Sequence, residues 1–269
     1  MNDDFVLTAD NYYSREANER YMSVHQFLDF VGYMGVEGCE ARALATLRGE
    51  YQPETTIPML VGSYVDSAIE GTLDKFKQEH PEIFTQKGEL KAQYRQAEKM
   101  LARMRRDNYF MRTLSGEKQV IMTANLFGCD WKIKMDSYIK DTAIVDLKTT
   151  GDLHKAWRIS PNEYATVVEY WAYVVQGAVY QKVVEMNTGK KLPFFLSFVT
   201  KEDEPELCVV SVDQETLDDA LEYVRDNMES VQLVKNGEVQ PQRCEKCAHC
   251  KRTAVLHKAI NYRDLILGE

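Results

Sequence analysis

The chain has 269 residues, 44% of them hydrophobic and 10% aromatic, enough to bury a substantial core, and its formal net charge is −9. It contains no apolar run of eighteen residues, which argues against a transmembrane helix, and its acidity argues against a protein that coats DNA by bulk charge. The opening residues MNDDFVLTADNYY lack the apolar stretch of a secretory signal, so we expect a cytoplasmic protein with six reduced cysteines.

Residues from about 10 to 112 carry mainly helical patterns. Ser23 is suited to cap a helix that contains Phe27 and Leu28, and a second helix is expected over residues 39–45. A third is expected over residues 59–76, with Gly62 in its first turn and with Asp66 and Glu70 on one face. An exposed acidic helix face is the alternative to a site role for these two carboxylates.

Residues 87–112 predict one further long helix with a basic stripe along one side. The stripe consists of Lys91, Arg95, Lys99 and Arg103 at four-residue intervals, extended by Arg105 and Arg106. In an acidic protein it is the best candidate for contacts with nucleic-acid phosphates. An ordinary solvated helix face is the alternative.

A short acidic hairpin is expected in the middle of the chain. Residues 117–126 and 131–135 alternate as strands of an antiparallel meander, with Glu117 and Gln119 as candidates for the edge of a site, and the meander leads into strands at 133–139 and 142–148. Side chains of a strand alternate between its faces, so Asp146 and Lys148 point the same way, and pairing brings Asp136 alongside. The alternative is a hairpin whose charged residues face water.

Two carboxylates and a lysine at one place have a chemical use. Carboxylate oxygens are ligands that Mg²⁺ and Mn²⁺ prefer, and such ions activate water for attack on a phosphodiester. A neighbouring lysine orients the water or neutralises charge that builds on the phosphate. The hairpin is therefore a candidate catalytic metal site.

The remaining chain completes an α/β pattern. Residues 151–161 are expected as a loop or short helix carrying Lys155, Trp157 and Arg158, cations suited to an incoming phosphate or to ordinary surface charge. A long aromatic helix is expected over 162–186, with Gln176 and Tyr180 on one face; internal hydrogen bonding is the alternative to a site role for both. Strands are expected at 194–200 and 207–212 and a helix at 213–234. The sum predicts an α/β fold in which a central mixed sheet is flanked by helices.

Three of these stretches, taken in order, resemble the PD-(D/E)xK nuclease superfamily, in its branch of RecE and lambda-exonuclease enzymes. They are Gly62-Ser63-Tyr64-Val65-Asp66, then Asp136 followed by Asp146-Leu147-Lys148-Thr149-Thr150, then Gln176-Gly177-Ala178-Val179-Tyr180. The resemblance spans most of residues 20–255 and implies a restriction-endonuclease-like core. It implies that Asp136 and Asp146 bind Mg²⁺, that Lys148 orients the water, and that Gln176 and Tyr180 support the site. Relatives often carry histidine where this chain has Asp66. Either Asp66 is an added metal ligand, or the site tolerates the loss of the histidine.

The resemblance also implies a function. It is a metal-dependent exonuclease that degrades DNA from duplex ends, 5′ to 3′, in phage-type recombination, together with a single-strand annealing protein and as a ring-shaped homo-oligomer. One alternative is an iron–sulfur nuclease acting on single strands, similar to CRISPR adaptation nucleases. Another is a nucleic-acid-binding module of the same fold that has lost turnover.

The C-terminal region carries a compact cysteine group. Cys244, Cys247 and Cys250 lie at two-residue gaps, and thiolates in such groups bind zinc or iron–sulfur clusters, normally with four ligands. Relatives in the superfamily place one cysteine before the core, which favours Cys39 as the fourth ligand; His249 or His257 in a zinc site, or free thiols, are the alternatives. We expect a single nuclease domain over 1–269, made of a helical part (10–112), a catalytic core (113–235) and this cysteine tail (236–269).

Overall fold

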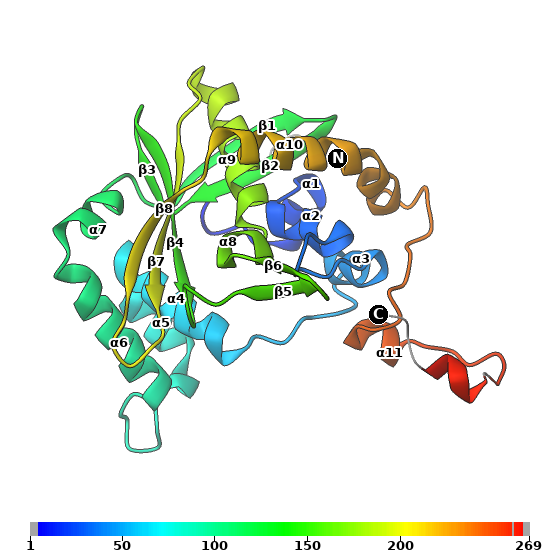
Figure 1. Ribbon diagram of the computed structural model, residues 1–269, viewed down its shortest axis with the longest axis horizontal. Coiled ribbons are helices and arrows are strands. Elements are labelled where there is room, and N and C mark those ends of the chain that lie inside the picture. Colours follow the sequence, from blue (N-terminus) through cyan, green and yellow to red (C-terminus); the bar gives the residue numbers. More distant parts are fainter. Residues whose placement is uncertain (1–4, 260, 266–269) are drawn as a thin grey trace.

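The N-terminal part of the chain is helical. The computed structural model describes residues 5–259 and 261–265 (Figure 1), so the outermost ends of the expected domain lie outside the described residues. Ahead of the first strand lie α1 (Arg15–Arg20), α2 (Val24–Val31), α3 (Glu40–Leu47), α4 (Ile57–Glu70), α5 (Leu73–Glu79), the 3-10 turn η1 (Pro81–Ile83), α6 (Ala92–Arg105) and α7 (Asn108–Thr113). Ser23 caps α2 as predicted, because its side chain accepts a hydrogen bond from the Gln26 backbone N–H at 3.3 Å.

Two predicted helices are wrong in extent. The helix expected over 59–76 ends at Glu70, because Gly71 has a φ of 83° and forms a left-handed C-cap, after which α5 begins. The helix expected over 87–112 begins only at Ala92, after the turn around Gly88, whose φ is 79°, and it ends at Arg105, so its last expected residues lie in the separate helix α7. In both places a glycine adopts a backbone conformation that other residues avoid.

The predicted mixed sheet is confirmed. Strands β3 (Ser137–Ile139), β4 (Ala143–Thr150), β7 (Phe194–Thr200) and β8 (Leu207–Ser211) form it in that order. The β4–β7 pair is parallel, and the outer pairs are antiparallel. Strands β1 (Val120–Leu126) and β2 (Cys129–Met135) form a separate antiparallel pair, so the expected meander is divided in two at Asp136.

The connection from β4 to β7 differs most from expectation. The stretch predicted as a loop or short helix ends in β5 (Trp157–Ser160), which pairs with β6 (Glu163–Ala165). The predicted single helix over 162–186 is divided into α8 (Val167–Tyr170) and α9 (Tyr173–Thr188). Thr166 and Glu169 form a capping box that starts α8, and Ala172, with a φ of 57°, separates the two helices.

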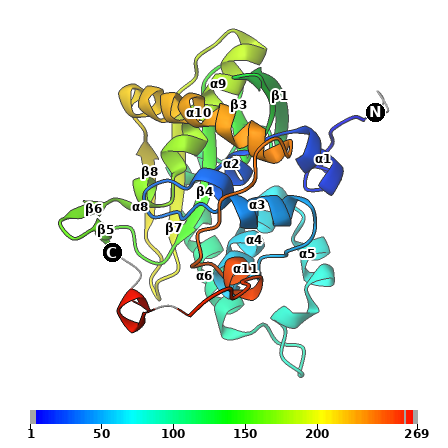
Figure 2. The same cartoon turned by 90° about the vertical axis from the view of Figure 1, so that its right-hand side faces the viewer.

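Helices cover both faces of the central sheet. The parallel β4–β7 pair needs a crossover, and α9 supplies it on one face, where it packs with α2 and with α10 (Gln214–Lys235). On the other face of the sheet lie α4 and α6 (Figures 1 and 2). Val145 and Leu147 of β4 belong to the same hydrophobic cluster as buried residues of these two helices. Alternation along β4 therefore leaves Ile144, Asp146 and Lys148 on the α9 side.

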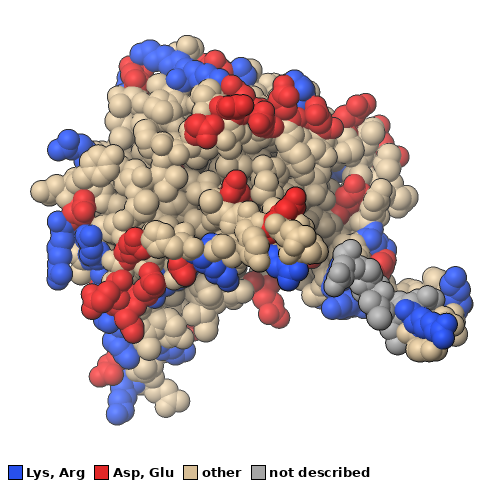
Figure 3. Space-filling view, in the orientation of Figure 1, with Lys and Arg blue, Asp and Glu red and all other residues tan. Residues whose placement is uncertain are grey.

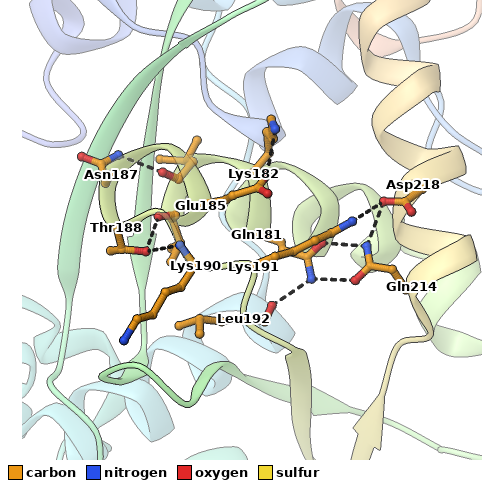
Figure 4. A network of polar contacts seen from close by, with 12 residues as sticks. Gln181, Lys182, Glu185, Asn187, Thr188, Lys190, Lys191, Leu192, Gln214 and Asp218 are labelled. Carbon is orange, nitrogen blue, oxygen red and sulfur yellow. Dashed lines mark hydrogen bonds and ion pairs between the residues drawn. The ribbon is translucent and has the colours of Figure 1, made fainter.

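A polar network fixes the middle of α9. The Gln181 side-chain amide donates to the backbone oxygen of Leu192 at 2.8 Å and to Gln214 Oε1 at 3.1 Å (Figure 4). Gln214 Nε2 donates in return to Gln181 Oε1 at 2.8 Å and to Asp218 at 2.8 Å. Because Gln181 is buried, these bonds hold α9 against the start of α10 and the approach to β7.

The negative charge of the chain is unevenly distributed. Acidic side chains gather along α10, which carries Glu215, Asp218, Asp219, Glu222, Asp226 and Glu229 (Figure 3). None of the α10 residues lines either of the two cavities described below. No helix within the described parts of the chain has the length and apolarity needed to cross a bilayer.

Candidate active site

Asp136, Asp146 and Lys148 meet at one place. Lys148 Nζ lies 2.5 Å from Asp146 Oδ2, on the same face of β4. Asp136 occupies the bend between β2 and β3, and its Oδ2 accepts a hydrogen bond from the Leu147 backbone N–H at 2.9 Å. The pairing of Ser137 with Val145 holds this bend beside β4. The predicted convergence of the three side chains is what the structure contains.

The three residues line a cavity of about 480 Å³ together with Asp66 and Glu70 from α4. Burial and the charge of Asp136 raise the pKa of Asp66 well above its usual value. Burial and the charge of Asp146 raise the pKa of Asp136 to about 7. For Lys148, burial alone would lower the pKa, but the adjacent Asp146 outweighs it and raises the pKa above its usual value, so this lysine is charged.

These residues fit a divalent cation. Their carboxylates supply hard oxygen atoms, and their mutual repulsion is what a bound cation relieves. Asp146 Oδ2 is buried and, among the described residues, has no hydrogen-bond donor besides its ion pair with Lys148. The carboxylates line a cavity, which leaves space beside them for water and for a substrate phosphate.

Gln176 and Tyr180 both reach the site from α9. Gln176 Nε2 donates to Asp146 Oδ1 at 2.6 Å, which fixes the orientation of that carboxylate. The Tyr180 hydroxyl donates to the backbone oxygen of Lys134 at 3.1 Å, which ties α9 to β2. Gln176 therefore contacts a candidate ligand directly, whereas Tyr180 positions the elements around it.

Comparison with known proteins identifies the family to which this chain belongs. A family described as a PDDEXK-like domain of unknown function (DUF3799) matches residues 23–253. The chain belongs to this PDDEXK-like family. The resemblance to the PD-(D/E)xK nuclease superfamily is thereby confirmed.

One solved structure shares the fold over almost the whole chain. A crystal structure of a protein from Eubacterium rectale named "Putative exonuclease" is 50% identical and has a TM-score of 0.96, and the match covers 98% of this chain and 100% of that one. A second structure, named SSO0001, matches 72% of this chain and 85% of that one with 12% identity and a TM-score of 0.26. Among curated proteins, none matches.

Some cavity residues of this PDDEXK-like chain have a weak signal in the sequence or none. Gln119, named only as a candidate for the edge of the site, donates to Glu70 Oε1 at 2.6 Å and to Asp136 Oδ1 at 3.3 Å, so it joins two carboxylates. Glu117 contributes only a backbone bridge to Tyr138. His25 of α2 also lines the cavity, and lost hydration together with Lys148 lowers its pKa.

Two further lysines were not foreseen either. Lys132 and Lys134 of β2 line the same cavity, and Lys134 Nζ lies 4.6 Å above the ring of Tyr13. No motif could have found them, because their place depends on how β2 packs against the N-terminal segment. Lys134, which is half-buried, gives the carboxylate site a positive rim, whereas Lys132 is buried and its ammonium group donates to the Tyr12 backbone oxygen and to Asn18 Oδ1.

The predicted basic stripe lies apart from this rim. Its members, Lys91, Arg95, Lys99, Arg103 and Arg106, lie along α6 and its ends, mostly exposed, and line neither cavity. Arg103 lies 3.8 Å from Asp107 in a surface ion pair. A role of the stripe in binding DNA stays a prediction.

The cysteine group is assembled as the resemblance implied. Cys39, the N-cap residue of α3, joins Cys244, Cys247 and Cys250, and their four sulfur atoms all lie within 4.8 Å of one another. The closest pair is Cys39 and Cys250, with 3.6 Å between sulfur atoms. Figure 2 shows how this brings α11 (Ala248–Arg252) beside α3. Four sulfur atoms at this spacing match the ligand number of zinc and of iron–sulfur clusters.

The surroundings of the group act differently on its thiols: burial raises the pKa of Cys39 to about 12 and also raises that of Cys247, whereas the pKa of Cys244 is lowered. Partial burial opposes ionisation, but backbone N–H groups of Cys247 and Lys246 lower the pKa of Cys244 to about 6. The histidine alternatives lie elsewhere: His249 packs edge-on against the Tyr51 ring at 5.4 Å, and His257 is exposed. The structure therefore brings Cys39, and neither histidine, to the three clustered cysteines.

Proposed function

We propose that this protein is a metal-dependent nuclease that hydrolyses DNA phosphodiester bonds from duplex ends. The observation that carries the proposal is the contact of Lys148 with Asp146 beside Asp136, within one cavity of a PDDEXK-like fold. The name of the 50%-identical Eubacterium rectale protein supports exonuclease activity rather than internal cleavage.

The side chains have separate tasks in this proposal. Asp136 and Asp146, with Asp66, would hold Mg²⁺ or Mn²⁺. When bound, such an ion activates a water molecule and stabilises the leaving oxygen. Lys148 stays protonated, so its ammonium group donates hydrogen bonds that orient the water or a phosphate oxygen. Gln176 keeps Asp146 from rotating away.

The finer parts of the proposal come from the resemblance to RecE-type enzymes. They are 5′ to 3′ polarity, action in phage-type recombination and repair, a single-strand annealing protein as partner, and a homo-oligomer that encloses DNA. Lys134 at the rim of the cavity supports DNA binding there, because phosphate contacts supply most of the affinity.

A second candidate is an iron–sulfur nuclease that acts on single strands. The four-sulfur group favours it, because iron–sulfur clusters are bound by four cysteine thiolates. Comparing the rates on blunt duplexes and on single strands of the same sequence separates the two candidates.

The test is cleavage of linear duplexes labelled at the 5′ or the 3′ end, with and without Mg²⁺. We expect Mg²⁺-dependent release of nucleotides that Asp146→Asn and Lys148→Ala each reduce by about 100-fold or more. Lys140→Ala, an exposed lysine in the turn of the same hairpin, is the control and keeps full activity. A wild-type protein without Mg²⁺-dependent cleavage, or full activity of Asp146→Asn with an intact fold, would contradict the proposal.

A further inference from the structure

A second cavity adjoins the carboxylate site. It has a volume of about 560 Å³, within the range of roughly 300–1,000 Å³ in which proteins bind small organic groups. Asp66, Leu147 and Lys148 line both cavities, so the candidate catalytic lysine lies between them. The outer part of the second cavity includes Lys155, Trp157, Trp171, Tyr173 and Lys201.

Its wall is aromatic and firmly supported. Trp157 stacks on Tyr170 with ring centroids 4.4 Å apart and planes at 27°, and Trp171 meets Trp157 edge-on at 5.5 Å. The backbone at Gly35 lies directly against the Tyr170 ring, since an added Cβ would lie 2.2 Å from it. Trp171 itself is 43% exposed, which is unusual for a tryptophan whose neighbours are packed.

The aromatic wall runs up to the candidate catalytic lysine. Lys148 Nζ lies 4.8 Å above the ring of Tyr173, and Tyr173 follows Trp171 by two residues. Between them, Ala172 is buried with a φ of 57°, a conformation that costs a non-glycine residue free energy. This turn leaves Trp171 open to solvent while Tyr173 packs under Lys148.

Two cations complete the cavity. Lys155 Nζ lies 3.9 Å above the Trp157 ring, and burial lowers the pKa of Lys201 although Asp66 opposes this. Across the described residues, neither lysine forms an ion pair with a carboxylate. Asp152 also lines the cavity, but its Oδ1 accepts hydrogen bonds from the backbone N–H groups of His154 and Lys155 at 2.7 and 3.1 Å.

We propose that this second cavity binds an unpaired nucleobase next to the phosphodiester bond that is cut. The base would stack on Trp171, and Lys155 and Lys201 would contact the adjoining phosphates. Aromatic side chains together with unpaired cations are the usual means of binding single-stranded nucleic acid without regard to sequence. The inference rests on the proposed nuclease function and adds to it a place for the base.

This assignment has a consequence for the substrate. Within a duplex both faces of a base are covered by neighbouring base pairs, so an internal base cannot stack on Trp171 unless it leaves the helix. A base at a frayed end or in a single strand has a free face. The cavity therefore favours DNA ends over internal positions.

The test compares ends that carry a base with ends that lack one. The full-length protein is kept in EDTA, which blocks metal-dependent hydrolysis, and is titrated with oligonucleotides. The two terminal positions of each oligonucleotide, at either the 5′ or the 3′ end, carry 2-aminopurine or are abasic. We expect one end to bind about tenfold more tightly with bases present, and 2-aminopurine fluorescence to fall on binding. Trp171→Ala removes the difference, and Trp171→Phe keeps part of it. Tyr109→Ala, a 65% exposed aromatic residue of α7 outside both cavities, keeps it all.

The outcomes separate the two proposals. Equal affinity for base-containing and abasic ends, or an equal loss for both in Trp171→Ala, overturns the base-binding cavity even if Mg²⁺-dependent cleavage is normal. Base-dependent binding that needs Trp171, in a protein without Mg²⁺-dependent cleavage, upholds the cavity and overturns the nuclease function. Melting temperatures of all variants are measured first, and loss of abasic binding by Trp171→Phe also counts against the proposal.

Discussion

The molecule has two candidate metal centres that are built in different ways. The carboxylate site comes from a bend and a strand within 13 residues of sequence, with help from α4 and α9, and it opens into two cavities. The cysteine group joins Cys39 to three residues more than 200 positions later and has its four sulfur atoms already together. One centre is open and carries hard oxygen atoms, whereas the other is closed and carries soft sulfur atoms.

The difference separates stability from turnover. A centre with four protein ligands has no position left for a substrate, which is typical of structural sites. A centre whose ligands line a cavity leaves positions for water and phosphate. We therefore expect changes at the cysteines to act on folding and changes at the carboxylates to act on catalysis.

The largest expected effect is the loss of the cysteine centre. Protein purified without oxygen should contain zinc, or iron with sulfide, at about one site per chain, and Cys39→Ser should lose it. Structural zinc supplies roughly 10–16 kcal/mol of folding free energy. If Cys39→Ser loses about 4 kcal/mol of this, the melting temperature falls by about 8–16 °C. Cys208→Ser, a half-buried cysteine of β8 outside the group, is the matched control. If the purified protein contains no metal and Cys39→Ser melts at the same temperature as the wild type, the proposed cysteine metal centre is contradicted.

Chelation distinguishes the two centres without mutation. Brief treatment with EDTA should abolish cleavage, and added Mg²⁺ or Mn²⁺ should restore it, because an open site exchanges its ion freely. The melting temperature should change little, since the closed sulfur group keeps its metal. Cleavage that survives EDTA, or a melting temperature that falls in step with the activity, would erase the distinction between the centres.

The contact between Gln176 and Asp146 should matter for turnover and little for folding. Gln176→Leu keeps the approximate volume but frees the Asp146 carboxylate, so kcat should fall about 10- to 100-fold, the cost typical of removing a partner of a metal ligand. The melting temperature should stay within a few degrees. Gln181→Leu provides the converse control, because Gln181 lies on the same helix but holds it to α10, and there stability should suffer more than kcat.

The smallest expected effect is a pH dependence of the carboxylate site. Without a bound cation, Asp136 has a pKa of about 7, above its unfolded value of about 3.9. Between pH 4 and pH 7, approximately, Asp136 is protonated in the folded state and ionised in the unfolded state. The free energy of unfolding of the metal-free protein therefore falls as the pH rises from about 4 to 7. Asp136→Asn should flatten this slope and abolish cleavage, and thermal unfolding in EDTA over this pH range measures it. A steeper slope in the variant would show that another group titrates.

The sequence predicted which candidate site residues come together because their placement is local. Asp136, Asp146 and Lys148 lie on one hairpin, and the two-residue period of a strand settles which of them share a face. Gln176 could also be predicted from the sequence, since a spacing of four residues places it on the same helix face as Tyr180. The mixed character of the sheet followed from the same patterns, but its strand order did not, and β7 was predicted with its observed limits.

What the sequence concealed depends on contacts between distant segments. His25, Lys132 and Lys134 reach the first cavity only because α2 and β2 pack beside β4, which no spacing reveals. The break before α9 was missed because Tyr170, Trp171 and Tyr173 continue a helical apolar pattern. Only the left-handed Ala172 interrupts it, in a conformation that alanine rarely adopts.

Because Cys39 meets cysteines more than 200 positions later, the cysteine group can form only after most of the chain has been synthesised. A growing chain displays the N-terminal helices and then the whole hairpin of Asp136 and Lys148 before Cys244 has been made. Helix α3, whose first turn follows Cys39, also contributes Ala43 and Leu47 to the wall of the first cavity. The thiols that fasten this wall are thus made after the candidate catalytic side chains, so a product truncated before Cys244 carries those side chains without their finished enclosure.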